Sequence, residues 1–545
     1  MKRWALLLLP AAFVLSYNLG SISYLETSEA RYAEIAREMV ESGDYVTPRL
    51  TYIKHFHKPP LTYWFTSLAF KVFGVNNLSG RVFLVLASLG ILVLNYKLAR
   101  LLFPDNQIPL WSTLILFSSP LYLVMSRTLT TDLYLFFFTT GAVYFLWKWY
   151  FETRKTIHAL LSGVFLGGAI LAKGPVPLIF YLLPWMVFLL FHRQKGKVRI
   201  RDLCCLSIIP LIINLPWIFL VVRENPGLID YFVKSQTLDR VSTTVHRRGG
   251  PVYYHLGVLF VGMLFWFSFF LGDFFRSVSR WKTLRSNREE TLLICFSIVP
   301  LLFFTLSQSK LIGYMLPALP FFALLTAYYL IEKFPSSGSH GGAHVLNGVL
   351  LGSLGVAASG LPIFQARLGI DIHPLLIVSI VALVLASLLA MASLLKRRRG
   401  AVFLIYAGFN IALFLLAMTV LPQFREEANS FEGIAERVEN HASGEYDVIT
   451  FNRRLPSLTF YTGRRVIQIP HHRETQFEDE DSRALLEEYL STDQGRVLEL
   501  ARRDKMTFLI ISKRRWRKLS KRFPELEDHL VKIYENRRDL LYCNM

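Results

Sequence analysis

Long apolar runs recur along most of the chain and decide what it can fold into. A helix needs roughly 20 mainly apolar residues to cross a bilayer. Stretches that meet this requirement lie at 4–22, 78–101, 107–125, 130–150, 157–173, 175–192, 203–222, 254–275, 291–308, 312–331, 344–364, 373–395 and 400–421. Only 18% of the 545 residues are charged, whereas soluble domains carry about 25%. The sequence therefore predicts an α-helical polytopic membrane protein with about 13 transmembrane helices.

The net charge is +20, and the Lys and Arg residues are concentrated in alternate loops, a pattern that indicates membrane topology. Short loops rich in Lys and Arg face the cytoplasm. If the N-terminus is cytoplasmic, the basic loops "KWYFETRKTIH", "HRQKGKVRIRD", "RSVSRWKTLRSNRE" and "KRRRG" all fall on the cytoplasmic side. Residues 23–77, residues 223–253 and the C-terminal tail then lie outside. This pattern argues against a nucleic-acid partner and predicts a multi-pass membrane protein with a cytoplasmic N-terminus, in contact with membrane lipids.

The composition changes near residue 422. Beyond it, "YDVITF", "RVIQIP" and "TFLIIS" are short β-rich runs, and "NSFEGIAERVENHA", "SRALLEEYL" and "RWRKLSKRF" have helical spacing. Strands that alternate with helices indicate a small α/β domain. We therefore expect a transmembrane domain over residues 1–421 and an α/β domain outside the cytoplasm over residues 422–545.

The first outer loop is unusually polar for such a chain. "EARYAEIAREMVESG" predicts a helix with Ala33 and Ala36 on one stripe and Glu34, Glu38 and Glu41 on the other. A helix of this kind directly after a span is typical of the membrane surface. "HFHKPPL" then breaks the helix before a second amphipathic stretch, "LTYWFTSLAFKVFG".

Several charged residues of the outer face are candidates for chemistry. Asp132 stands at the mouth of an apolar run, where an ionisable side chain is functional by default, although a carboxylate that stabilises a helix N-terminus is the alternative. Arg31, Lys58 and Lys310, with Tyr314 beside the last, come from three separate stretches of the same side. Such cations suit a phosphate at headgroup level; attraction to ordinary anionic lipid is the alternative.

Histidines also gather on the predicted outer side. His55, His57, His246 and His255 lie there, and two or three histidines can bind a divalent metal. We take His57 and His246 as candidate ligands. Ordinary interfacial histidines are the alternative, and the sequence does not require a cofactor.

Several motifs together resemble those of a known family. They are "SEARYAEIAREMVESGDYVTPRL", "HFHKPPLTYW", "TTDLYLFFFTTGAVYF", "LAKGPVPLIFYLLPW", "LPWIFLVVRENPGLIDYF" and "SKLIGYMLPALPFFALL". The chain resembles the GT-C glycosyltransferases of the protein-O-mannosyltransferase superfamily over roughly residues 5 to 425. It is most similar to the bacterial transferases that add 4-amino-4-deoxy-L-arabinose to lipid A.

The resemblance implies a fold, a reaction and site residues. It implies a GT-C fold with surface helices in the first outer loop, and inverting transfer of a sugar from a polyprenyl-phosphate donor at a periplasmic active site. By position in the family motifs, Arg31, Tyr32 and Lys58 match donor-phosphate positions. Lys310 and Tyr314 match a loop that closes the cavity. Asp132 and Glu29 match acidic positions.

One departure concerns the catalytic carboxylate. The Asp that the family places before Glu29 is Ser28 here, and a serine hydroxyl is a poor general base. Glu29 or Glu26 supplies the carboxylate instead, or the acceptor is a phosphate that is already ionised and needs little base help.

Two further alternatives stay open. The chain is a transporter or flippase of a lipid-linked sugar if its charges serve translocation. If it is a transferase, the acceptor is lipid A, another glycolipid of the envelope, or a protein.

Overall fold

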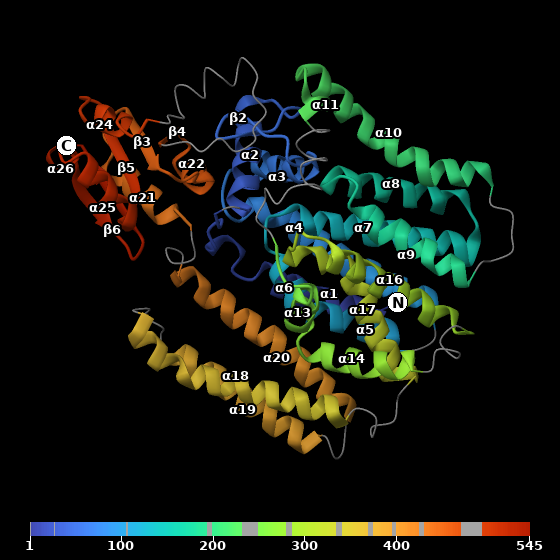
Figure 1. The fold of residues 1–545 in the computed structure, drawn as a ribbon. Coiled ribbons are helices and arrows are strands. Elements are labelled where there is room, and N and C mark those ends of the chain that lie inside the picture. The colour runs from blue at the N-terminus through green and yellow to red at the C-terminus, as the bar shows by residue number, and fades with distance from the viewer. Residues whose placement is uncertain are drawn as a thin grey trace. The chain divides into compact units, whose positions relative to one another are not determined.

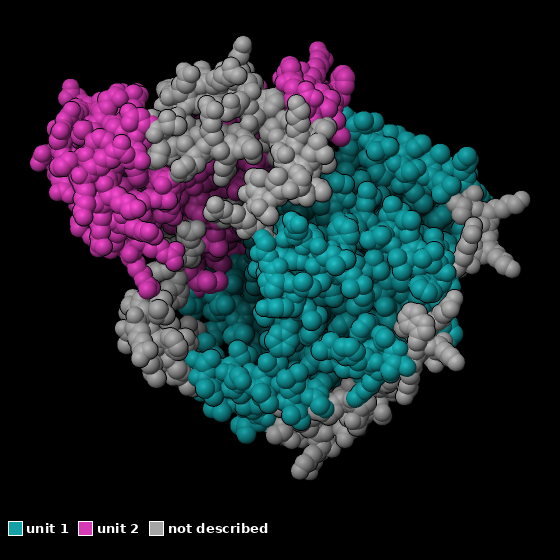
Figure 2. Space-filling model, in the orientation of Figure 1, with its two compact units in different colours: residues 1–18, 84–215, 246–420 teal, residues 19–83, 216–245, 421–545 magenta. Residues whose placement is uncertain are grey.

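The computed structural model describes residues 2–26, 28–104, 107–192, 199–231, 249–279, 286–333, 341–368, 374–394, 399–424, 430–469 and 493–544. The chain divides into two compact units, coloured separately in Figure 2. Unit 1 comprises residues 1–18, 84–215 and 246–420, and unit 2 comprises residues 19–83, 216–245 and 421–545. The predicted α/β segment thus begins where unit 2 resumes, and unit 2 additionally contains the whole first outer loop, residues 23–77.

Unit 1 is built from helices (Figure 1). Its elements are α1 (Lys2–Ser16), α4 (Ser79–Leu102), α5 (Ile108–Phe117), α6 (Pro120–Met125), α7 (Thr131–Lys148), η2 (Trp149–Thr153), α8 (Thr156–Lys173), α9 (Pro177–Phe191), α10 (Ile200–Glu224), α13 (Tyr254–Met263), α14 (Phe265–Val278), α16 (Arg288–Leu306), η4 (Ile312–Ala318), α17 (Leu319–Tyr328), η5 (Tyr329–Lys333), α18 (Gly341–Leu368), α19 (Pro374–Leu394) and α20 (Arg399–Val420). The first residues of α4 and the last of α10 belong to unit 2.

Every predicted span coincides with helical structure, and the chain is a multi-pass membrane protein. Within the described ranges, six helices are long and apolar enough to cross a membrane. Two predicted spans are broken: 107–125 divides into α5 and α6 at Ser118 and Ser119, and 254–275 divides into α13 and α14 at Leu264. Leu264 has φ +49°, a backbone conformation that ends a helix. The count of 13 spans stays a prediction.

The helices α7 and α8 form an antiparallel hairpin, joined by the π-helical turn η2. They pack closely because glycines, which have no side chain, leave room for aromatic rings of the partner helix. A Cβ at Gly141 would lie 2.1 Å from the Phe165 ring, and one at Gly168 would lie 2.6 Å from the Phe138 ring. The Ser162 hydroxyl on α8 also donates to the Ala142 carbonyl on α7, at 2.8 Å. This hairpin places the start of α7 beside the end of α8.

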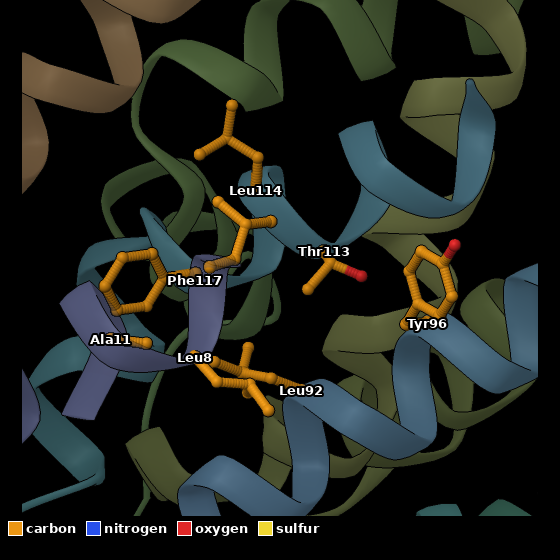
Figure 3. A pocket seen from close by; sticks show the side chains of 8 residues that line it. Leu8, Ala11, Leu92, Tyr96, Thr113, Leu114 and Phe117 are labelled. Carbon is orange, nitrogen blue, oxygen red and sulfur yellow. The ribbon is translucent and has the colours of Figure 1, made fainter. Parts of the chain in front are cut away.

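A small apolar pocket lies between α1, α4 and α5 (Figure 3). Its lining is almost entirely aliphatic and aromatic, and includes Leu8, Leu92 and Phe117. Thr113 and Tyr96 are its only polar lining residues. The pocket holds about 10 Å³, roughly the space of one water molecule, so it is a packing defect.

The first outer loop forms the helical part of unit 2. Its elements are η1 (Leu19–Ser21), α2 (Glu29–Ser42), β1 (Arg49–Leu50), β2 (Ile53–Lys54) and α3 (Leu61–Phe73), with α11 (Leu228–Tyr231) from the later loop. Both predicted helices of this loop are present. Ile35 and Met39 of α2 pack with Leu50 and Tyr63 in a small core. Glu34 and Glu38 of the glutamate stripe are enclosed by protein, whereas Glu41 is exposed.

The C-terminal part of unit 2 is a five-stranded mixed sheet. Its elements are η7 (Leu421–Phe424), α21 (Glu432–His441), β3 (Tyr446–Phe451), α22 (Pro456–Thr462), β4 (Val466–Ile469), α24 (Arg496–Ala501), β5 (Met506–Ser512), α25 (Lys513–Arg522), α26 (Leu526–His529), β6 (Val531–Glu535) and β7 (Asp539–Cys543). The strand order is β4-β3-β5-β7-β6. β3 pairs in parallel with β4 and β5, whereas β7 pairs antiparallel with β5 and β6.

Helices cover both faces of this sheet. α21 and α22 pack on one face around Val448 and Phe508, and α24, α25 and α26 pack on the other around Leu509. The three predicted strands are confirmed as β3, β4 and β5, and the basic helix is confirmed as α25. Sequence reasoning missed β6 and β7, and β6 is an edge strand that carries charges. The predicted helix over "SRALLEEYL" lies outside the described residues.

Candidate functional site

The α7–α8 hairpin of unit 1 brings an acid and a base together at one end. Asp132 lies in the first turn of α7, and Lys173 is the last residue of α8. The Lys173 ammonium donates to Asp132 Oδ1, and the two side chains are 4% and 15% exposed. Thr130 occupies the N-cap position, where its hydroxyl accepts from the Asp132 amide. The Asp132 carboxylate is therefore not needed as the cap, which was the alternative to a functional role.

The 3₁₀ helix η4 lies against this pair. A Cβ at Gly313 would lie 2.6 Å from the Asp132 carboxyl carbon, so only glycine allows η4 to approach so closely. The Lys173 ammonium lies 4.9 Å from the centroid of the Tyr314 ring, a cation–π contact. Unit 1 thus brings the predicted site residues Asp132 and Tyr314 together through Lys173.

Lys310 is held by the end of a neighbouring helix. Its ammonium donates to the carbonyls of Phe304 and Thr305 at 3.0 and 2.7 Å, and the residue is buried. A cation at the C-terminus of α16 satisfies carbonyls that lack helical partners. The structure therefore gives Lys310 a structural role beside the phosphate contact predicted for it.

In unit 2, Glu29 begins α2 and forms a buried ion pair. Its Oε1 lies 3.2 Å from Arg81 Nη2, and its other oxygen accepts from the Leu25 amide. The Arg81 guanidinium also donates to the Ile22 carbonyl at 2.5 Å and lies 4.6 Å from the centre of the Tyr24 ring. Glu29 therefore helps to hold the chain that enters α2.

Glu26 is held at the start of another helix of unit 2. Its Oε1 accepts from both the amide, at 2.9 Å, and the hydroxyl of Ser457 in the first turn of α22. A carboxylate at this position satisfies a helix N-terminus. Ser28, where the family has Asp, is exposed at the N-cap position of α2.

A cationic cluster surrounds His55 in the same unit. Burial lowers the pKa of His55 well below its usual value, and the positive charges of His57, Arg454, Arg31 and Lys58 lower it further. The Nε atom of Arg31 is buried and has no hydrogen-bond partner within the described structure. Arg31 and Lys58 thus both lie within electrostatic reach of His55. The structure adds Arg454, which donates to the Leu50 carbonyl at 2.9 Å.

The remaining predicted residues of unit 2 make ring contacts. Tyr32 stacks on Tyr63 with ring centroids 5.7 Å apart. The ring centroids of His57 and His55 are 4.0 Å apart. Among the described residues, no group of three or more His, Cys, Asp or Glu side chains is placed to hold a metal. His246 lies outside the described residues, so the metal site stays untested and no step is derived through it.

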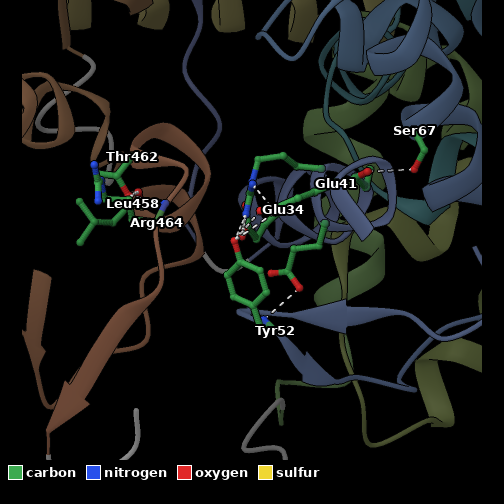
Figure 4. Close-up of polar contacts among 10 residues, drawn as sticks. Glu34, Glu41, Tyr52, Ser67, Leu458, Thr462 and Arg464 are labelled. Carbon is green, nitrogen blue, oxygen red and sulfur yellow. Dashed lines mark hydrogen bonds and ion pairs between the residues drawn. The ribbon is translucent and has the colours of Figure 1, made fainter. Parts of the chain in front are cut away.

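A buried acidic network on α2 positions the segment that carries the cations. Arg37 forms two hydrogen bonds of 2.8 Å with Glu34 and one with Glu41, and it reaches the Tyr52 hydroxyl at 3.1 Å (Figure 4). The Tyr52 amide donates to Glu38 at 2.9 Å. Burial, and then the neighbouring carboxylate of Glu34, raise the pKa of Glu38 well above its usual value.

This network compensates for strain in the β1–β2 turn. Thr51 and Tyr52 have φ values of +54° and +65°, which non-glycine residues rarely adopt. The bond from the Tyr52 amide to Glu38 stabilises that turn, and His55 follows directly after β2. α2 therefore fixes the backbone from which His55, His57 and Lys58 extend.

Sequence reasoning missed three residues of these groups. Lys173 stood in the quoted motif "LAKGPVPLIFYLLPW", at the end of the predicted span 157–173, but was not singled out. Arg454 follows β3 in "FNRRLP", where two adjacent arginines after a strand were the available signal. Arg81 lay in a predicted span, where a buried charge signals a partner.

Comparisons with known proteins give one matching family model and several related transferases. Residues 4–224 match the family model for dolichyl-phosphate-mannose-protein mannosyltransferase. The chain is 29% identical over 362 residues, 65% of this chain and 64% of the relative, to the undecaprenyl phosphate-alpha-4-amino-4-deoxy-L-arabinose arabinosyl transferase 2 of Proteus mirabilis. It is 31% identical over 345 residues, 60% of this chain and 59% of the relative, to the corresponding transferase of Yersinia pestis. The chain spans somewhat less than two thirds of the length of these relatives.

The fold has a solved counterpart. ArnT from Cupriavidus metallidurans, in the apo state, matches with a TM-score of 0.81 and 22% identity over 99% of this chain and 98% of that chain. The same enzyme bound to undecaprenyl phosphate matches equally well. The protein therefore has the GT-C glycosyltransferase fold. The resemblance to the lipid A aminoarabinose transferases is confirmed at the level of sequence and fold.

Proposed function

We propose that this protein is an inverting membrane glycosyltransferase that moves a sugar from a polyprenyl-phosphate donor to an acceptor at the periplasmic face. Its relatives transfer 4-amino-4-deoxy-L-arabinose from undecaprenyl phosphate, as their names state. The observation that carries the proposal is the cationic cluster around His55. The resemblance assigns Arg31 and Lys58 to the donor phosphate. Together with Arg454, their positive charges lower the pKa of the buried His55.

The reaction transfers one glycosyl group from the donor phosphate to the acceptor. The acceptor oxygen attacks the anomeric carbon of the donor sugar while the bond from that carbon to the phosphate oxygen breaks. The electron pair of that bond stays on the leaving polyprenyl phosphate. Arg31 and Lys58 stabilise the negative charge that develops on this phosphate. Electrostatic stabilisation of this kind is usually the largest single contribution to catalysis. The buried, unpartnered Nε of Arg31 is the donor that this role requires.

The carboxylates have different tasks in this proposal. Asp132 orients the acceptor and takes its proton where the attacking oxygen is a hydroxyl, and Lys173 holds the Asp132 carboxylate in place through the ion pair described above. Glu29 and Glu26 are positioning residues, because Arg81 and Ser457 already occupy their oxygens. If the acceptor is a phosphate, no other residue has to replace the family Asp that is Ser28 here, because an ionised phosphate oxygen carries no proton to remove.

The membrane orientation and the acceptor are part of the same proposal. The N-terminus is cytoplasmic, and the C-terminal α/β domain is periplasmic in the bacterial inner membrane. The acceptor is lipid A or another glycolipid of the envelope. The basic loops support the orientation, and the names of the relatives support the sugar.

The decisive experiment is reconstituted transfer. Purified protein in detergent is mixed with undecaprenyl-phosphate aminoarabinose and lipid A, and the product is identified by mass spectrometry. Turnover without a sealed vesicle supports an enzyme, and donor consumption only in sealed vesicles supports a flippase instead. Mass spectrometry of lipid A and of envelope proteins, from cells with and without the gene, then identifies the acceptor.

A further inference from the structure

The C-terminal sheet has an edge where its parallel strands end. β3 and β5 are parallel neighbours, so Phe451 and Ser512, their last residues, lie at the same edge. The chain leaves β3 toward β4 on one side and leaves β5 toward β7 on the other, as the strand order shows. In open α/β sheets, ligands bind outside the carboxyl ends of strands at such a reversal of strand order.

A cavity of about 610 Å³ opens at this edge. It is lined by Asn452 after β3, Ser512 at the end of β5, and Arg514, Arg515, Lys518 and Arg522 of α25. Volumes of 300–1,000 Å³ are typical of small-molecule sites. None of the described residues that line the cavity is acidic. In Figure 1, α25 lies beside the strands of this sheet.

The cations of this cavity lack carboxylate partners within the described structure. Arg515 donates only weakly, at 3.4 Å, to the Phe451 carbonyl, and Arg522 donates to the neutral amide of Gln494 at 3.1 Å. Arg514 and Lys518 form no ion pair with any described residue. The nearby Asp539 is already paired with Arg453 at 2.6 Å. Burial and then the Arg453 charge lower the pKa of Arg515, and the Asp539 carboxylate partly opposes them.

The start of α25 adds to this positive field. Ser512 is the N-cap residue, and its side chain forms no capping hydrogen bond. The Lys513 amide donates to the Arg538 carbonyl at 3.0 Å, whereas the amides that follow it in the first turn lack intrahelical acceptors, and the helix dipole favours an anion at that end. Asn452, with φ +54°, and Gln494 line the same cavity with neutral hydrogen-bonding groups that suit sugar hydroxyls.

We propose that this cavity binds a phosphorylated saccharide, with the phosphate held by Arg514, Arg515 and Lys518 at the start of α25. Guanidinium groups bind phosphate oxygens with paired hydrogen bonds, and the volume exceeds what a phosphate alone needs. The ligand is either a soluble sugar phosphate or the phosphorylated headgroup of a glycolipid. The inference rests on the cavity and does not depend on the transferase proposal.

Binding by the full-length protein tests the proposal. Glucose 1-phosphate is titrated by calorimetry into protein in neutral-lipid nanodiscs, with glucose and inorganic phosphate titrated in parallel. We expect saturable binding of glucose 1-phosphate, weaker binding of inorganic phosphate and none of glucose. R514Q/K518Q should weaken binding about tenfold or more. Absence of saturable binding, or equal binding of glucose, would overturn the proposal.

A matched variant separates a site from general charge attraction. Arg517 and Lys521 are exposed on the same helix but do not line the cavity, so R517Q/K521Q makes the same change in charge. We expect this control to bind glucose 1-phosphate within about twofold of wild type, and both variants to keep the wild-type circular dichroism spectrum. Equal losses in the two variants would contradict a defined site. Competition by lipid A added to the nanodiscs identifies a glycolipid headgroup as the source, and its absence identifies a soluble ligand.

Discussion

Lys173, at the end of α8, forms a largely buried ion pair with Asp132, at the start of α7. Forty-one residues separate them in sequence, and only the antiparallel hairpin brings them together. Gly313 and Tyr314 of η4 complete the surroundings of the pair. Removal of one member of a buried pair leaves an uncompensated charge, whereas removal of both does not.

The Asp132–Lys173 pair can be tested by a double substitution. Asp132→Asn and Lys173→Met alone should each lower the stability, by about 3–5 kcal/mol, and reduce transfer severely. Asp132→Asn/Lys173→Met should recover most of the stability but not the activity. The measurements are the thermal midpoint in detergent and the transfer rate. Recovery of activity in the double variant would make the pair purely structural.

Arg31 and Lys58 should act on the donor phosphate. Arg31→Ala and Lys58→Ala should each reduce transfer about ten- to a hundredfold, because a lost charge-assisted contact costs roughly 1.5–3 kcal/mol. Expression and thermal midpoint should stay near those of wild type. Lys71→Ala, which removes an exposed cation of α3, is the matched control and should transfer normally. Wild-type rates in both test variants would remove these residues from the mechanism.

Glu29 should matter for stability more than for the chemical step. Glu29→Gln leaves the Arg81 guanidinium buried without its carboxylate, so we expect a lower thermal midpoint. The transfer rate per folded molecule should fall less than in Asp132→Asn. Ser28→Asp should be tolerated, because Ser28 is exposed. A Glu29→Gln protein with wild-type stability and no transfer would instead identify Glu29 as the base.

Glu38 should make stability depend on pH. Its raised pKa means that the folded chain keeps a proton that the unfolded chain, with a usual Glu pKa of about 4.3, releases. This contribution to stability is complete below about pH 4.3 and is lost as the pH rises toward the folded-state pKa. Glu38→Gln does not titrate, so its thermal midpoint should increasingly exceed that of wild type between about pH 5 and 8.

Glu41→Gln is the control for that pH dependence. Glu41 belongs to the same network, but its side chain is 50% exposed and pairs with Arg37 at 2.8 Å. Its substitution should bring no gain in stability as the pH rises. A Glu38→Gln curve parallel to wild type across the range would show that Glu38 is ionised in the folded protein.

The sequence by itself determined the elements of the fold. Apolar runs, the polar stretch before Lys58 and the β-rich runs after residue 422 are local signals, because a helix or strand is specified by its own spacing of apolar residues. The predicted spans, α2, α3, α25 and three of the five C-terminal strands follow from them. The family motifs then indicated the fold and the class of donor.

Tertiary structure alone decided which partners each charged residue has. Glu29 and Glu26 looked equally suited to catalysis in the sequence, but Arg81 and Ser457 occupy them. Lys310 was grouped with Lys58 as a cation, yet its ammonium is bound to helix carbonyls. The role of a charge depends on its partners and its burial. Partners that lie tens to hundreds of residues apart are set by packing, which no local pattern encodes.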